Sequence, residues 1–465
     1  MIKHFPFRAA CLLWILTLLT MQTTSCSRAP EQISASPFDL PDRFSLSGDV
    51  AASAQWWQNM NDPALVALIE HALSDNFSLL IARDRLAEAR ASARQAGARL
   101  SPILEGDGQG KTLRNYQTDS TKNTLLLELA ASYEIDLWGR LAAIRDAAVL
   151  NSRATRDDLF TAAISIAAEV AQTWYRIVEA ELQLQLMQKQ KKTNGRVLEL
   201  IELRFHAGQS GAPDVLQQRQ LVESNNAELA DSRRSLQLLN HKLALLLGEF
   251  PGSYTAPATP VLPSLPPLPD TGIVLDLLNR RPDIRSSYLL IQAEDRQVAA
   301  AIADRLPRLS ISANLSTSGN QAGDLFNNWF TTFAANIAGP IIDGGYRKAE
   351  VEKRKAKMNR RLNEYGETVL RAIGEVEDAL TQEKTEAEIL ASLKTRLKLA
   401  KQTVNHVADR YRMGAEDYQR VLLALISYQG LEQKIIKSKR LSINYRISLY
   451  RALGGNFPLD TGQED

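Results

Sequence analysis

The histidines are the residues whose chemistry is easiest to recognise, because an imidazole can bind a metal or act as a general base. His71, His206, His241 and His406 are scattered along the chain, and none belongs to an HExxH pair. The sequence also contains no nucleophile elbow and no phosphate-binding P-loop. We therefore expect no metal and no cofactor, and an enzyme only if its site is built from unremarkable residues.

Alternating glycines form a second candidate, because a glycine-rich loop can cradle phosphates. Gly106, Gly108 and Gly110 are superficially similar to such a loop, but their last spacing differs from G-x-G-x-x-G and no helix pattern opens after them. Residues at alternate positions share one face of a strand. We interpret the three as strand glycines.

A cysteine near the N-terminus is the remaining candidate for chemistry. Lys3 and Arg8 precede a short apolar core over residues 9–21, which is typical of an export signal. Cys11 lies inside that core and would be removed with it. The exported chain would then keep Cys26 alone and could form no internal disulfide.

The residues before Cys26 suggest why it is there. Thr23-Thr24-Ser25-Cys26 resembles a bacterial lipoprotein box, with Thr23 where that motif usually has Leu. We predict a signal peptide over residues 1–25 and a covalent lipid on Cys26; the alternative is a plain cleaved signal with an incidental cysteine. Ser27 follows, where Asp would signal retention in the inner membrane, so we expect an outer-membrane location.

The composition limits which classes of function and fold remain possible. A net charge of +2 across 465 residues leaves no large positive excess to neutralise a phosphate backbone, so nucleic acid is not an expected partner. Aromatic residues make up only 6%, and the apolar residues are mainly Ala and Leu, which favours long helices. Beyond the signal no run of about 18 apolar residues occurs. If the exported chain crosses a membrane, we expect it to do so with strands.

The chain carries an internal repeat with an offset of about 206 residues, shown by landmarks that recur in the same order. The paired positions are Pro102 and Pro307, Asp136 and Asp343, Arg204 and Arg410, Gly208 and Gly414, and Gly248 and Gly454. We predict a first structural repeat over 26–250, a Pro-rich extended linker over 251–270, a second repeat over 271–455 and a tail over 456–465.

Each repeat is predicted to hold one helix, a strand pair and two further long helices. The first helix is expected from about Pro63 to Leu100. Between Tyr346 and Met413 apolar residues recur at alternating threes and fours without a proline, which indicates a coiled-coil helix of roughly 100 Å. Residues 166–187 repeat the pattern. A plain coiled-coil rod is the simpler alternative for the helices alone.

Strands with one apolar and one polar face argue against a simple rod. The alternation is clear in Leu127–Leu137, Leu309–Ser316 and Trp329–Ile341, and Leu104–Thr112 is expected to pair with the first. Such strands suit a membrane barrel, but four are too few to close one, so several subunits would have to contribute. The expected fold is mainly α with a small β part; a soluble sandwich would need more strands.

Three motifs then resemble the TolC-like outer-membrane efflux lipoproteins, often called the NodT family. They are Trp56-Trp57 followed by Asp62-Pro63-Ala64-Leu65, the segment Tyr133–Arg140, and the segment Asn279–Arg285. The resemblance implies a homotrimer whose subunits each give four strands to one twelve-stranded barrel and their long helices to a periplasmic α-barrel. It also implies passive export of small molecules, with a periplasmic adaptor and an inner-membrane pump as partners. A type I secretion duct and a lipid-anchored periplasmic scaffold are the alternatives.

The resemblance also indicates where the partner would bind. Arg204 with Gly208, and Arg410 with Gly414, look like the turns at which paired helices of the family reverse and meet the adaptor. Glycine permits a tight reversal at a helix end, and arginine offers hydrogen-bond donors. The alternative for the arginines is a purely structural role in a helix-turn-helix.

The periplasmic entrance departs from the family pattern. Relatives often carry aspartates just beyond the second turn, whereas Arg420 and Leu423 stand there in this sequence; Asp214 keeps an acid near the first turn. A purely acidic constriction is therefore not expected. Our hypothesis is that Asp214 and Arg420 pair between neighbouring helices and hold the entrance closed.

Overall fold

The computed structural model describes residues 41–50, 53, 55–253 and 260–455, which belong to the unit that begins at Pro41. The predicted signal peptide 1–25, Cys26 and the tail 456–465 lie outside the described residues. The described parts of the predicted linker, 251–253 and 260–270, contain no helix.

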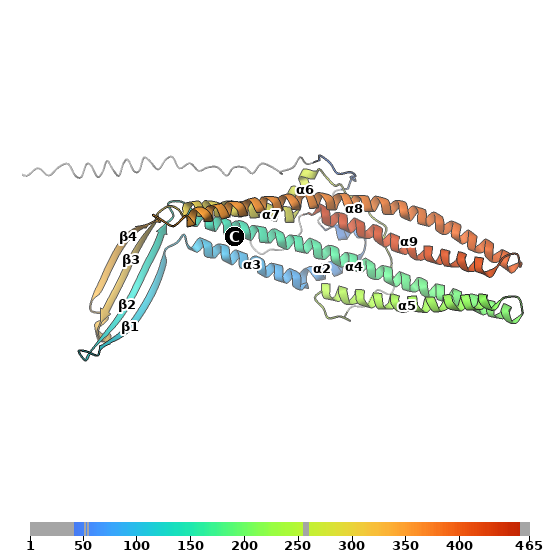
Figure 1. Ribbon diagram of the computed structural model, residues 1–465, viewed down its shortest axis with the longest axis horizontal. Helices are drawn as coiled ribbons and strands as arrows, with labels where there is room; N and C mark the ends of the chain where they lie inside the picture. Colours follow the sequence, from blue (N-terminus) through green and yellow to red (C-terminus); the bar gives the residue numbers. More distant parts are fainter. Residues whose placement is uncertain (1–40, 51–52, 54, 254–259, 456–465) are drawn as a thin grey trace, which may run out of the picture. The chain divides into compact units, whose positions relative to one another are not determined.

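Two sets of α-helices and strands follow each other in the same order (Figure 1). The first set is η2 (Trp56–Met60), α2 (Pro63–Asp75), α3 (Phe77–Ala98), β1 (Ile103–Asn115), β2 (Ser120–Ile135), α4 (Arg140–His206) and α5 (Ala212–Leu246). The second set is α6 (Val274–Arg280), α7 (Pro282–Ala303), β3 (Arg308–Gly319), η3 (Ala322–Asp324), β4 (Trp329–Ala338), α8 (Tyr346–Arg412) and α9 (Tyr418–Leu453). The predicted long helix of the second half is confirmed as α8, and α4 has the same 67 residues.

The prediction of one helix from Pro63 to Leu100 is wrong, because the helix breaks at Asn76. This residue has an extended backbone, and its side-chain oxygen accepts hydrogen bonds from the amides of Ser78 and Leu79, which caps α3. Its side-chain nitrogen donates to the carbonyl of Leu246 at the end of α5. Asn76, which is held by a hydrogen bond to α5, therefore ends α2 and starts α3.

The two 67-residue helices, α4 and α8, each begin at a glycine a few residues after an aspartate. Gly139 and Gly345 have positive φ angles of 70° and 87° at the N-caps of α4 and α8. Asp136 accepts hydrogen bonds from two backbone amides in the first turn of α4, and Asp343 accepts from the backbone amides of Gly345 and Arg347. The carboxylates satisfy amides that a helix start leaves unpaired and favour its positive dipole end.

The four strands form one antiparallel sheet in the order β1-β2-β3-β4, which confirms the predicted strand pairs. Neighbouring strands are in continuous register, with Leu129 opposite both Gly106 on β1 and Leu315 on β3. The predicted fourth strand reaches Ile341, but β4 ends at Ala338 because Gly339 and Pro340 follow, and proline cannot donate to a ladder. Both β1 and β4 are edges of the sheet.

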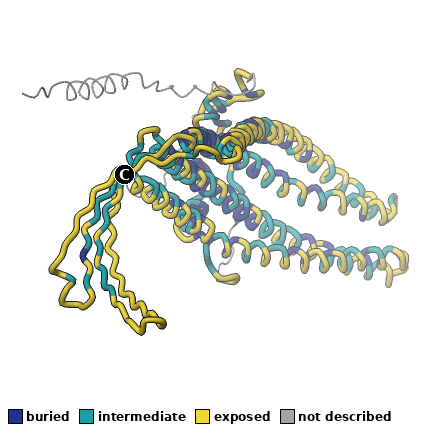
Figure 2. The backbone as a smooth tube through the Cα atoms, turned by 60° about the vertical axis from the view of Figure 1, so that its left-hand side comes forward, coloured by how far each residue is buried: buried dark blue, intermediate teal, exposed yellow. Residues whose placement is uncertain are grey.

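The main hydrophobic core joins the N-terminal segment to the middle of α4 and the end of α9, and buried residues concentrate there (Figure 2). Trp56 stacks on Tyr450 at 5.4 Å, while Trp57 meets Trp56 edge-on at 5.7 Å. Asp62 caps α2 through the amide of Leu65 and also accepts from the indole of Trp174 on α4. The tryptophan pair of the sequence motif is therefore part of the core that joins η2 and α2 to α4.

In the described part of the chain, no single helix combines the length and apolar character needed to cross a membrane. The bent pair α2 and α3, with 42° between them, meets those two criteria together.

Candidate functional site

The predicted site residues lie around two helix reversals with the same geometry. Between α4 and α5, the amide of Gln209 donates to the carbonyl of Arg204 at 2.8 Å, and Gly208 has a φ of 72°. Between α8 and α9, the amide of Ala415 donates to the carbonyl of Arg410 at 2.9 Å, and Gly414 has a φ of 71°. This is the Schellman motif, in which a left-handed glycine ends the helix.

The arginine of each turn has a different role, although both sit where a cation favours the negative end of the helix dipole. The guanidinium of Arg204 lies 4.5 Å from the ring centre of Tyr411, which belongs to the other turn. The side chain of Arg410 stays in its own turn, with Nε 3.4 Å from Glu416 and a hydrogen bond to the carbonyl of Ala415. Arg204 therefore links the two turns, and Arg410 stiffens one of them.

A small apolar cluster lies just above the turns and draws on all four long helices. Its buried members are Ile201, Val215, Tyr418 and Leu422, and the partly buried Tyr411 of α8 packs against them. The hydroxyl of Tyr418 donates to Gln218 on α5 at 2.5 Å, which joins α9 to α5. Burial, together with nearby Tyr411 and Asp214, raises the pKa of Tyr418, so the tyrosine remains a neutral donor.

The structure does not form the hypothesised pair of Asp214 and Arg420 within the chain. Asp214 accepts from the hydroxyl of Ser210 at 2.7 Å and from the amide of Gly211 at 3.3 Å, at the start of α5. Arg420 instead lies 3.2 Å from Glu416. Asp214 and Arg420 hold equivalent third positions in α5 and α9, and each contacts residues that lie just before its own helix.

Leu423, an exposed residue of the predicted entrance, lies on α9 outside the apolar cluster. Leu203 and Met413 are further exposed apolar residues close to the two turns. The structure thus brings Arg204 into contact with the second turn, and it leaves Arg420 and Leu423 open to solvent.

Further along the same helices, buried amides replace the apolar seam. Asn194 on α4 is fully buried and donates to Asn225 on α5 at 2.7 Å and to Gln429 on α9 at 3.2 Å. Gln429 donates back to Asn194 at 2.9 Å, and Gln218 donates to the carbonyl of Asn194 at 2.7 Å. These residues satisfy one another's polar groups in a place where unpaired amides would be costly.

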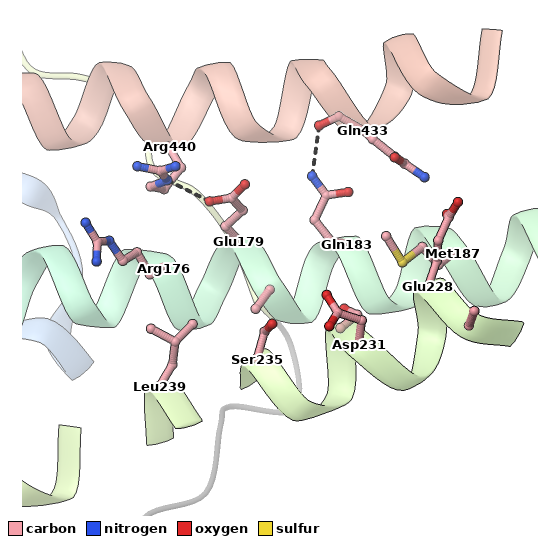
Figure 3. A pocket seen from close by; sticks show the side chains of 13 residues that line it. Arg176, Glu179, Gln183, Met187, Glu228, Asp231, Ser235, Leu239, Gln433 and Arg440 are labelled. Atoms are coloured by element: carbon pink, nitrogen blue, oxygen red, sulfur yellow. Dashed lines mark hydrogen bonds and ion pairs between the residues drawn. The ribbon is translucent and has the colours of Figure 1, made fainter. Parts of the chain in front are cut away.

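The polar contacts continue along a groove of about 760 Å³ between α4, α5 and α9 (Figure 3). Gln183 donates to the carbonyl of Gln433 at 2.8 Å, and Arg440 pairs with Glu179 at 2.6 Å. Both interactions join α4 to α9. In the described residues no group of three or more His, Cys, Asp or Glu side chains is placed to hold a metal.

Sequence reasoning missed this buried polar layer, although the sequence carries a signal for it. The apolar seam of α4 runs through Leu184 and Met187, and the next positions at threes and fours are Gln190 and Asn194. Amides at seam positions of a coiled coil indicate buried hydrogen bonds. The partners Asn225 and Gln429 lie far along the chain and are not evident from spacing.

Comparison with known proteins agrees with this geometry. The profile of the family described as outer membrane efflux protein matches residues 68–249 and 274–455. The chain belongs to the outer membrane efflux protein family.

Particular relatives extend the similarity over almost the whole chain. The pyoverdine export outer membrane protein OpmQ of Pseudomonas aeruginosa is 29% identical, with 89% of each chain covered. The cation efflux system protein CusC of Escherichia coli O157:H7 is 28% identical over 94% of this chain and 97% of its own. The solved structure of the Neisseria gonorrhoeae MtrE outer membrane channel matches with a TM-score of 0.84 and 25% identity, covering 93% of this chain and 99% of that one.

A solved structure of CusC matches with a TM-score of 0.81 and 26% identity, covering 90% of this chain and 99% of that one. The resemblance to TolC-like efflux proteins is thus confirmed, and so are the mainly helical fold with a small sheet and the outer-membrane location. This protein is an outer-membrane efflux protein.

Proposed function

We propose that this chain is one subunit of a homotrimeric channel in a tripartite pump, through which small molecules pass passively to the exterior. Each copy gives its four strands to a shared closed sheet and its long helices to a periplasmic duct. A periplasmic adaptor and an inner-membrane pump are its partners. The protein has no catalytic role in this proposal.

One observation carries the assembly: the four-stranded sheet ends in two open edges while its apolar side chains face outward. Leu104 on β1 and Phe333 and Ile337 on β4 are exposed. A hydrophobic sheet with open edges is stable in lipid only if further strands pair with both edges. Copies of the same chain supply those strands. A periplasmic scaffold would give no reason for such a sheet.

The helix turns support contact with an adaptor at the opposite ends of α4 and α8. Both turns are held by Schellman motifs, and apolar side chains remain exposed beside them, at Leu203 and Met413. Exposed apolar groups on a rigid turn suit a protein partner. In the proposal, Arg204, Gly208, Arg410 and Gly414 form the adaptor-contact turns.

In this proposal the inner-membrane pump, and not the channel, selects which molecules are exported. The printed names of the relatives cover pyoverdine export and cation efflux, so similar chains serve different cargoes. We assign export in general to this chain, and no single cargo.

Lipid attachment is a separate part of the proposal. Acylation of Cys26 would anchor the N-terminus in the outer membrane. Labelling cells with a palmitate analogue tests it: the wild-type chain should carry label, and a Cys26→Ser chain should not. Equal labelling of both chains would refute lipidation at this residue.

The assembly is tested by measuring the mass of the detergent-extracted protein and its mobility in SDS with and without heating. We expect a trimer that resists SDS until it is heated. A monomer or dimer in detergent would overturn the proposed channel and leave a scaffold as the better account.

A further inference from the structure

The repeated elements give a residue-by-residue correspondence between the two halves of the chain. Helices α3 and α7 both have 22 residues, and α4 and α8 both have 67. The offsets are 282 − 77 = 205 for α3 to α7 and 346 − 140 = 206 for α4 to α8. A contact made by one half can therefore be translated to the other half.

The strands obey the same correspondence. Ile103 on β1 lies opposite Ser132 on β2, and Arg308 on β3 lies opposite Ala338 on β4. The offsets are 308 − 103 = 205 for β1 to β3 and 338 − 132 = 206 for β2 to β4.

Inside one chain the halves meet where β2 pairs with β3 and where α4 packs on α7. Asp157 pairs with Arg285 at 2.7 Å, and Ser286 donates to Asp158 at 2.6 Å across this seam. Ile164 lines a small pocket there together with residues at the start of α7. This seam shows how the strands of one repeat, and the helices next to them, pack on those of the next repeat.

The same positions on the outer sides of the chain are apolar and uncovered. Ile164 is 8% exposed, whereas its counterpart Leu370 on α8 is 52% exposed. Ser286 is 3% exposed, whereas its counterpart Ile81 on α3 is 51% exposed. Phe77, the counterpart of buried Pro282, is 66% exposed. Large apolar side chains at equivalents of buried positions indicate a second seam of the same kind.

The same offsets predict the strand register of this second seam, in which β4 of one copy pairs with β1 of another. Within the chain Leu129 lies opposite Leu315, and the offsets translate this pair to Ala335 on β4 and Gly110 on β1 of another copy. The pair Ala131 and Ala313 translates in the same way to Ile337 and Gly108.

The translated register fits the shapes of the two edges. Leu127 and Leu125 of β2 already cover the space beside Gly108 and Gly110, at 3.4 Å and 3.5 Å from where their Cβ atoms would stand. The translated register places Ile337 beside Gly108 from the other side, where the glycine leaves room for it. The translated register also keeps the apolar faces of all strands on one side of the sheet. A slip of one residue would turn the apolar face of the added strand to the opposite side.

We propose that a second copy of this chain covers the α3 and β1 side with its own α8 and β4 side, in the register that sets Ala335 opposite Gly110. This rests on the proposed trimer and adds which residues meet between copies. A slip of two residues, which also preserves the faces, is the competing arrangement.

Disulfide trapping in outer membranes distinguishes these registers, because a disulfide needs close Cα atoms and diagonal neighbours lie further apart. The test chain carries Gly110→Cys with Ala335→Cys. The matched controls carry Gly110→Cys with Phe333→Cys or with Ile337→Cys, which a two-residue slip would favour. Gly108→Cys with Ile337→Cys is a second test chain, in case the first does not fold.

We expect the test chains to form covalent dimers and trimers on mild oxidation about tenfold faster than the controls, and reduction to reverse this. Faster linkage in either control, with a trimer in detergent, would overturn the register and leave the proposed function intact. Absence of linkage in every chain, together with a monomer in detergent, would overturn both.

Discussion

The guanidinium of Arg204 at the end of α4 lies 4.5 Å from the ring centre of Tyr411 at the end of α8, so the two helix reversals touch through one cation–π contact. The hydroxyl of Tyr411 has no hydrogen-bond partner in the described part of the chain, which leaves its ring as the interacting group. Replacing Tyr411→Leu should remove about 1 kcal/mol of attraction between the turns. Tyr411→Phe keeps the ring and should change little.

Limited proteolysis at residues 207–211 and 413–417 measures this contact, because cleavage follows local opening of the turns. We expect cleavage of the Tyr411→Leu protein to be about fivefold faster than wild type. Equal rates for the Leu and Phe variants would show that the aromatic contact does not hold the turns together.

The turn glycines give a second prediction. Gly208 and Gly414 have left-handed backbones, so Gly208→Ala or Gly414→Ala should cost about 1–2 kcal/mol of unfolding free energy. Gly195 lies inside α4 with open space around it, and Gly195→Ala should stabilise by up to about 1 kcal/mol. Urea unfolding of the three variants checks the opposite signs, and a stabilising Gly208→Ala would contradict the Schellman geometry.

The buried amide layer predicts an asymmetric response to mutation. Asn194→Leu leaves Asn225 and Gln429 without partners and should cost about 1–3 kcal/mol for each buried group left unpaired. Asn226→Ala, which removes only a contact to nearby Glu223, should stay within about 0.5 kcal/mol of wild type. Thermal unfolding in detergent compares them; similar melting temperatures for both variants would refute the structural role of the layer.

A pH dependence follows from Asp270, which joins the linker to the N-terminal segment. Hydrogen bonds from the amide of Gly272 and the hydroxyl of Ser47 lower the pKa of Asp270 below its ordinary value. A lowered folded pKa means that the stabilisation is present above the ordinary value and is lost as pH falls through the lowered one.

Asp270→Asn should therefore be less stable than wild type near neutral pH, and the gap should narrow below about pH 4. Urea unfolding at several pH values measures the gap, and Ser47→Ala should reduce it in part. A gap that stays constant down to about pH 3 would contradict the hydrogen-bonded carboxylate.

The sequence predicted the elements well where periodicity is long and local. The 67 residues of α8 follow from an uninterrupted seam, and the strands follow from alternation. The break at Asn76 was missed because its cause is the contact with Leu246, far along the chain. Local composition cannot reveal a cap that is held by a distant carbonyl.

The site could be predicted only in part, because contacts between residues far apart in the chain are not evident from local sequence. Spacing and resemblance pointed to the two turns, and the structure places Arg204 and Arg410 there. Within the chain Asp214 does not pair with Arg420, and its carboxylate instead accepts hydrogen bonds from Ser210 and Gly211 beside it at the start of α5. Which partner a charge finds depends on packing that the sequence does not state.

Planar-bilayer conductance of the purified protein, with its mass in detergent, tests the central claim most directly. We expect trimeric channels with discrete steps and low resting conductance, and a higher open fraction in the Tyr411→Leu protein. A protein that is monomeric or dimeric and conducts no current would contradict the account.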